Sequence, residues 1–305
     1  MQYGFSLVVR GEDANPDTFA AIAERSEALQ LDSLWLSAHV ILPLQTKSDY
    51  ILIPGRKHDA HWKDNYWEPF TILSYLSAMT SKITLGTSIV VLPMHNPFEL
   101  AKQVAEVDQL SRGRFIFGIG VGWFEEEFEA LGQAFHNRGK RTDEALELMH
   151  KLWTEEPVTF SGQYYNVTEA SFRPKPVQQP GPPIWVAGGS RAALRRAARF
   201  GSAFHPVRPS YEYMGEIRSE LNALLDEYQR PHDSVDISVK FPMAFDDDAN
   251  DPSSPTIGTP QSIIDSLRRY QDLGGNHFVL DAKPETLQAT LDTMERFAQE
   301  IRPKL

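Results

Sequence analysis

The stretch Arg112–Leu131, RGRFIFGIGVGWFEEEFEAL, decides the fold that we predict for this chain. A strand is predicted over Arg114–Val121, and alternation divides its side chains between two faces. Glycine weakens a strand interior, so three glycines at alternate positions indicate close approach of a ligand or of another backbone. The bulky face carries Phe115, Phe117, Ile119, Val121 and Trp123, and the bare face ends in Gly118, Gly120 and Gly122.

Two interpretations of the bare face stay open at this point. The glycines clear room for a flat molecule at the carboxyl end of the strand, or they fit the tight packing of a barrel. On the first interpretation Gly120, Gly122 and Trp123 are candidate cofactor contacts. A dinucleotide fingerprint is rejected, because its G-x-G-x-x-G spacing is replaced here by G-x-G-x-G and the third glycine for helix–strand packing is absent.

Length and composition restrict the class of protein. The chain has 305 residues, which suits one α/β barrel domain over residues 1–305. The formal net charge of −11 disfavours nucleic acid and anionic membranes as partners. The absence of cysteine excludes disulfides and thiolate catalysis, and the N-terminus lacks the features of a signal peptide. We therefore expect a cytoplasmic protein.

Strand-like and helix-like segments alternate along the whole chain. Eight βα units predict a closed (β/α)8 TIM barrel, with an open doubly wound sheet as the alternative. Insertions interrupt the alternation after strands 2, 4 and 7, at Val40–Trp67, Glu155–Pro183 and Asp246–Thr259. The predicted strands are Tyr3–Val9, Ser33–Ser37, Ile83–Leu92, Arg114–Val121, Pro183–Ala187, Ser202–Val207, Val235–Phe245 and Asn276–Leu280.

Active sites of such barrels gather at the carboxyl ends of the strands. His39 follows the second strand and is the candidate catalytic residue, since imidazole exchanges protons near neutral pH. Ala187, Gly188, Gly189 and Ser190 follow the fifth strand and precede a helix, where free backbone N–H groups can bind a cofactor phosphate. The alternative for Ser190 is an ordinary N-cap.

Four long stretches together resemble the bacterial luciferase-like superfamily of flavin- and deazaflavin-dependent oxidoreductases. They are SLWLSAHVILP, ITLGTSIVVLPMHNPFELAKQVAEVDQLSRGRFIFGIGVGWFEEEFEALG, RGKRTDEALELMHKLWTEEPVTFSGQYY and PKPVQQPGPPIWVAGGSRAALRRAARFG, and they cover about residues 30–200. Within this superfamily, the sequence most resembles the subgroup of probable oxidoreductases that depend on the deazaflavin coenzyme F420. Ala38 departs from this pattern, because related enzymes often carry aspartate there.

The resemblance implies a set of roles. The F420 ring would lie at the barrel mouth, with His39 beside its reactive carbon and with a non-prolyl cis peptide at Ser88–Ile89 against it. The reaction would be hydride transfer with a small organic substrate. The alternative is an FMN-dependent monooxygenase that uses reduced FMN and O2. A separate reductase is then a candidate partner that supplies the reduced cofactor. A non-catalytic flavin-binding barrel is a second alternative. The resemblance also implies a homodimer.

Three further groups of residues receive weaker functional interpretations. His58, His61 and Asp59 could bind a metal, but no third cluster matches them, so we predict no metal site. The aromatic residues of the same insertion are interpreted as a lid or pocket wall. A basic run before a helix could reach an anionic cofactor tail or form a solvated face. The aromatic residues are Trp62, Tyr66 and Trp67, and the basic run consists of Arg138, Lys140 and Arg141.

Overall fold

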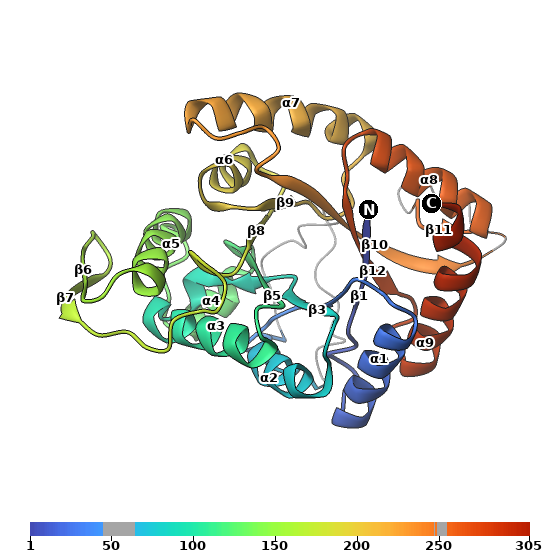
Figure 1. The fold of residues 1–305 in the computed structure, drawn as a ribbon, viewed down its shortest axis with the longest axis horizontal. Coiled ribbons are helices and arrows are strands. Elements are labelled where there is room, and N and C mark those ends of the chain that lie inside the picture. The colour runs from blue at the N-terminus through green and yellow to red at the C-terminus, as the bar shows by residue number, and fades with distance from the viewer. Residues whose placement is uncertain (45–64, 247, 249–254) are drawn as a thin grey trace.

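The computed structural model describes residues 1–44, 65–246, 248 and 255–305, and its centre is a closed parallel barrel (Figure 1). Eight strands follow one another round the barrel in the order β10, β12, β1, β2, β3, β5, β8 and β9, and the pairing of β9 with β10 closes it. Their bounds are β1 Gln2–Ser6, β2 Ser33–Leu36, β3 Thr84–Thr87, β5 Phe115–Gly120, β8 Ile184–Ala187, β9 Ala203–His205, β10 Asp236–Phe245 and β12 His277–Ala282. The predicted TIM barrel is therefore confirmed, and the open sheet is excluded.

Helices surround the barrel and connect its strands (Figure 1). Several begin where the sequence supplies both a side-chain cap and a proline in the first turn, as Asn15 and Asn96 do for α1 and α3. The helices are α1 Pro16–Ala28, α2 Pro69–Met79, α3 Pro97–Ser111, α4 Glu125–Ala130, α5 Arg138–Thr154, α6 Arg191–Phe200, α7 Tyr211–Glu227, α8 Pro260–Asp272 and α9 Leu287–Arg296.

Two predicted segments differ in detail from the structure. The predicted strand Ile83–Leu92 is divided into β3 and β4, Val90–Val91, by a cis peptide bond at Ser88–Ile89, as the resemblance implied. The predicted interruption Glu155–Pro183 contains an antiparallel hairpin of β6, Val158–Ser161, and β7, Asn166–Ala170. This hairpin was missed because its strands have only four and five residues and β7 is largely exposed.

The insertions after strands 2 and 7 are only partly described. In the first, Tyr66 forms an isolated bridge with Arg10. In the second, the short strand β11, Ile257–Gly258, extends the sheet beside the end of β10.

The two faces of β5 have the unequal character that the sequence indicates. Phe115 and Phe117 face the helices and belong to the main hydrophobic core. Ile116 packs against Trp35 and Trp185 inside the barrel, so the glycines of this strand also face inward. At Gly118 an added Cβ would overlap the carbonyl oxygen of Thr87 on β3. The packing interpretation therefore holds at Gly118.

Aromatic and polar side chains fill the barrel interior. The rings of Trp35 and Trp185 stack with centroids 4.3 Å apart. The indole N–H of Trp35 donates to Ser33 Oγ at 2.7 Å, and Ser33 Oγ lies 2.8 Å from His277 Nε2. Burial, with a smaller contribution from His205, lowers the pKa of His277 to about 3, so this imidazole is neutral in the folded protein.

We expect Gly118→Ala to destabilise the barrel, because the new methyl group collides with a backbone carbonyl that the neighbouring strand holds in place. Overpacking of this kind costs about 1–3 kcal/mol. Gly189→Ala is the matched control, since an added Cβ there meets no atom within 4 Å. Urea unfolding of both variants measures the difference, and equal stabilities would show that β5 has room at Gly118.

His277 should make the folded protein sensitive to acid. Its pKa is about 3 when folded, against an ordinary value of 6.5. Between these values the unfolded chain binds a proton that the folded chain does not, so the free energy of unfolding falls as pH decreases. The limiting slope is about 1.4 kcal/mol per pH unit.

His277→Gln should reduce that slope between pH 4 and 6, whereas His232→Gln, at an exposed histidine, should leave it close to wild type. Denaturant unfolding at several pH values provides the measurement. An unchanged slope in His277→Gln would show that this histidine takes up a proton in the folded state.

Candidate active site

The residues predicted to form the site lie at one end of the barrel. His39 follows β2, Ser88 and Ile89 follow β3, Gly120 ends β5, and Ala187 ends β8. These four strands are consecutive in the order of the sheet. The structure therefore brings the predicted residues to neighbouring positions along one half of the mouth at the carboxyl ends.

His39 is held by a carboxylate from a distant part of the chain. Its Nδ1 lies 2.8 Å from Oε2 of Glu127, whose side chain is completely buried at the start of α4. The other oxygen, Oε1, accepts from the backbone N–H groups of Val40 and Ile41 at 2.7 and 3.3 Å. With Nδ1–H donated to the carboxylate, the imidazole is oriented and its Nε2 can accept a proton.

Tyr66 also packs against this imidazole. The two rings meet edge to face with centroids 5.3 Å apart. The Tyr66 hydroxyl lies 2.6 Å from Ser37 Oγ, so Ser37 and His39 of one loop both contact this side chain. Burial raises the pKa of Tyr66 to about 12, which keeps the phenol protonated at neutral pH.

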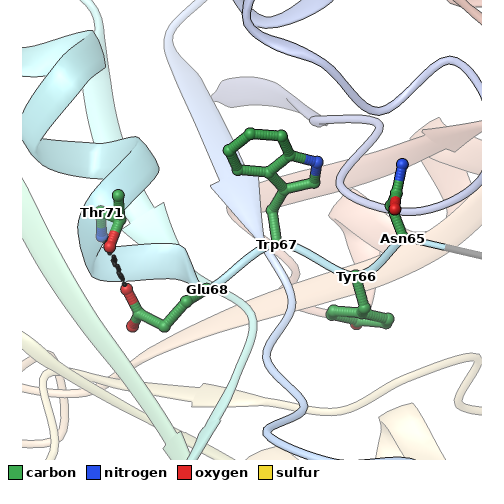
Figure 2. Close-up of a pocket in the computed structure, with 5 residues that line it drawn as sticks. All are labelled: Asn65, Tyr66, Trp67, Glu68 and Thr71. Atoms are coloured by element: carbon green, nitrogen blue, oxygen red, sulfur yellow. Dashed lines mark hydrogen bonds between the residues drawn. The ribbon is translucent and has the colours of Figure 1, made fainter.

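A pocket of about 330 Å³ adjoins this arrangement and is lined by Asn65, Tyr66, Trp67, Glu68 and Thr71 (Figure 2). Figure 2 shows Tyr66 and Trp67 projecting to opposite sides of the chain. The indole of Trp67 donates to the carbonyl of Ala14 and packs against Phe19, so its role is structural. Trp62 lies outside the described residues, and Tyr66 is the aromatic residue that lines the pocket and reaches His39.

Ser88 connects the cis peptide to the barrel interior. Its Oγ lies 2.9 Å from Nε2 of His205, and Nδ1 of His205 lies 3.1 Å from Ser238 Oγ. Burial, assisted by the charge of Lys240, lowers the pKa of His205 to about 3. A neutral histidine fixed on both nitrogens positions Ser88 and is unsuited to proton exchange near pH 7.

The glycines at the end of β5 differ from one another. At Gly120 an added Cβ would lie 2.7 Å from Cδ1 of Ile89, at the tip of a flexible side chain. Gly122 has a φ of +79°, and its added Cβ would lie 2.8 Å from Phe128, so both backbone and packing favour glycine there. The ring of Trp123 stacks on Phe124 with centroids 5.0 Å apart.

The segment after β8 has the geometry of a capped helix start. Ser190 is the N-cap of α6, and its Oγ accepts from the backbone of Ala193 at 3.3 Å. Gly188 has a φ of +140°, and Gly189 is exposed with open space beside it. The N-cap interpretation of Ser190 thus holds, while the first-turn N–H groups of α6 lack intrahelical acceptors and can still receive an anion.

The basic run, predicted to precede a helix, lies in the first turn of α5, and its two arginines are engaged within the protein. Arg138 donates to the carbonyls of Gly122 and Phe135, and Arg141 donates to Asn137, Gln133 and Ala134. These two arginines therefore fix the loop after α4 to α5. The partner of Asp143 is Arg196, at 2.6 Å, and the third basic residue, Lys140, is exposed.

The metal prediction falls partly outside the structure. His58, Asp59 and His61 lie outside the described residues. In the described part of the chain, no group of three or more histidine, aspartate or glutamate side chains is placed to bind a metal ion.

Glu127 and Lys240 were missed by sequence reasoning. Glu127 is one of three consecutive glutamates, which the sequence associates only with the start of a helix, and its partner His39 lies 88 positions earlier. Lys240 stands in a strand that reads as ordinary core, yet its Nζ lies 3.3 Å from Asp281 Oδ1. Alternation along β10 could have placed Lys240 inside the barrel, but nothing local indicates its partner.

Comparison with known proteins gives relatives with two cofactors. The chain is 31% identical over 244 residues to the F420-dependent glucose-6-phosphate dehydrogenase of Kineococcus radiotolerans, covering 78% of this chain and 66% of that protein. It is 34% identical over 154 residues to the FMNH2-dependent dimethylsulfone monooxygenase of Pseudomonas putida, covering 50% of this chain and 42% of that protein.

The fold also matches solved structures. An F420-dependent secondary alcohol dehydrogenase, solved with an F420–acetone adduct, superimposes with a TM-score of 0.81 at 18% identity, covering 99% of this chain and 98% of that one. The model of the luciferase-like monooxygenase family matches residues 1–255. This chain therefore belongs to the luciferase-like monooxygenase family, whose members are F420- or FMN-dependent oxidoreductases and monooxygenases.

Proposed function

We propose that this protein is an F420-dependent oxidoreductase that transfers a hydride between the deazaflavin and a small organic substrate. The observation that carries the proposal is the His39–Glu127 pair at the barrel mouth, since it presents an oriented imidazole nitrogen. Hydride transfer to or from a carbonyl or an alcohol needs a partner proton transfer, and an oriented histidine can perform it. When bound, the cofactor supplies the hydride chemistry.

The residues of the mouth fit such a cofactor. Gly120 carries no side chain at the mouth, and the flexible end of the Ile89 side chain that lies beside it can shift to admit a ring. The start of α6, with Gly188, Gly189 and Ser190, supplies backbone N–H groups for a phosphate. Trp123 and Ala187 border these two regions in the chain. We assign the ring to the first region and the phosphate to the second.

The relatives favour F420 over FMN. The F420-dependent dehydrogenase is similar across 78% of this chain, whereas the FMNH2-dependent monooxygenase is similar across half of it. An FMN monooxygenase is the second candidate, and it would require reduced FMN from a reductase. A non-catalytic flavin-binding barrel is a weaker candidate, because a buried glutamate that orients a histidine is unnecessary for storage alone.

The homodimer and the cytoplasmic location stay predictions. Among the described helices, none has the length and apolar character that a membrane crossing needs.

Cofactor titration tests the choice between the two candidates. We expect the purified protein to bind F420 at least ~10-fold more tightly than FMN, a difference of about 1.4 kcal/mol. Quenching of the fluorescence of each cofactor gives both dissociation constants. Tighter binding of FMN, together with O2 consumption in the presence of reduced FMN, would favour the monooxygenase.

His39→Asn should lower turnover by roughly 100-fold or more, the usual scale for loss of an acid or base, while F420 still binds. Glu127→Gln should lower turnover by about 10-fold, since the imidazole loses its anionic acceptor. Glu129→Gln, at an exposed position of the same helix, is the control and should behave as wild type.

The assay follows F420 reduction with glucose 6-phosphate and propan-2-ol as probes, because the names of the relatives point to these substrate types. Unchanged turnover in His39→Asn would remove this residue from the mechanism. Loss of F420 affinity with normal turnover at saturating F420 would make it a binding residue.

A further inference from the structure

A second polar cluster lies inside the barrel, on the strands β10, β12 and β1. It consists of Lys240 on β10, Asp281 on β12 and Ser6 on β1, and it is termed the inner polar site below. Lys240 Nζ lies 3.3 Å from Asp281 Oδ1. The pairing of Phe5 with Leu280 places Ser6 beside Asp281 on neighbouring strands, and Ser6 also pairs with Trp35, which lies in the interior.

Two atoms of the inner polar site lack hydrogen-bond partners. Ser6 Oγ and Asp281 Oδ1 are inaccessible to solvent and find no such partner among the residues that the structure describes. The contact of Asp281 Oδ1 with Lys240 is an ion pair by distance, without the alignment of a hydrogen bond. Buried polar atoms are normally satisfied, because leaving one unpaired costs about 1–3 kcal/mol. A bound group that offers a donor to Asp281 and a hydrogen-bond partner to Ser6 would remove this cost.

The inner polar site adjoins the surface to which the ring is assigned. Lys240 Nζ lies 3.4 Å from Ser88 Oγ and 3.5 Å from the Ser88 carbonyl oxygen, which belongs to the cis peptide. The Lys240 side chain thus reaches from β10 across the interior to the residue that follows β3. A molecule in contact with the Ser88–Ile89 bond therefore lies beside Lys240, which is paired with Asp281.

The charges define the kind of group that fits. Lys240 and Asp281 neutralise one another, so the site disfavours an anion, which Asp281 would repel, and a cation, which Lys240 would repel. Lysine offers only donors, an ionised carboxylate only acceptors, and serine both. The complementary ligand is neutral and presents a donor flanked by acceptors.

We propose that the inner polar site binds the pyrimidinedione edge of the ring, where N3–H is the donor between two carbonyl acceptors. Asp281 accepts from N3–H, and Lys240 and Ser6 donate to the carbonyl oxygens. FMN and F420 share this edge, so the assignment holds for either cofactor. It rests on the proposed function, because it requires that a flavin-like ring binds at the mouth.

The first test compares FMN with 3-methyl-FMN on the wild-type protein. Methylation removes the N3 donor, so we expect at least ~10-fold weaker binding, in line with the loss of a hydrogen bond to a charged group. Fluorescence quenching gives both dissociation constants. Equal affinities within twofold would overturn the proposal, and this comparison requires no variant to fold.

The second test uses the double variant Lys240→Met/Asp281→Leu, which removes both charges together and leaves neither uncompensated. Its affinities for FMN and F420 should each fall by ~10-fold or more, and its discrimination against 3-methyl-FMN should disappear. The control Lys151→Met/Glu155→Gln removes an exposed ion pair and should change neither. Circular dichroism verifies folding.

The outcomes separate two kinds of failure. A folded double variant that binds both cofactors as wild type does, and still discriminates against 3-methyl-FMN, overturns this inference alone. A wild-type protein that binds neither FMN nor F420 overturns the proposed function and the inference with it.

Discussion

The indole of Trp35 is the constraint on which the barrel interior depends. It projects from β2 into the interior, and the two strands that flank β2 carry glycine beside it. An added Cβ at Gly4 would lie 2.7 Å from its Nε1, and one at Gly86 would overlap the ring itself. Trp185 stacks on its face from across the barrel. The Trp35 side chain thus requires glycine at the adjacent positions of the two neighbouring strands. Together with Trp185 it fills the barrel interior below the mouth.

This filled layer determines where polar chemistry can occur. Below the indole, Ser33 accepts its N–H and contacts His277, so this polar layer is satisfied within the protein. Above it, at the carboxyl ends, Ser6 and Asp281 carry buried oxygens without hydrogen-bond partners in the described structure. The buried polar atoms are hydrogen-bonded at the end of the barrel that holds Ser33 and His277, and some are unpaired at the carboxyl ends of the strands. A ligand is therefore expected to bind at the mouth formed by the carboxyl ends.

The sequence predicts the barrel well because its signals are local. Alternation on β5 separates core-facing Phe115 and Phe117 from the inner glycines, and caps such as Asn15 mark where helices begin. The contacts of the site are not local. His39 and Glu127 are 88 residues apart, and their proximity depends on where the barrel places the loops after β2 and β5. The hairpin of β6 and β7 was missed for a different reason, since its strands have only four and five residues and β7 is mostly exposed.

The distribution of charge at the mouth explains why the cofactor phosphate is assigned to α6. Glu125 and Glu126 begin α4, where their charges repel an anion despite the favourable helix dipole. Lys240 is already paired with Asp281, so no net positive charge faces the interior from that pair. The first turn of α6 contains no acidic residue and opens with Arg191. In a chain with a net charge of −11, this turn is where an anionic group meets donors and little repulsion. With the phosphate at α6 and the proton-transferring imidazole at His39, the ring would span the strands between them, which are β3 and β5 with the cis peptide and Gly120.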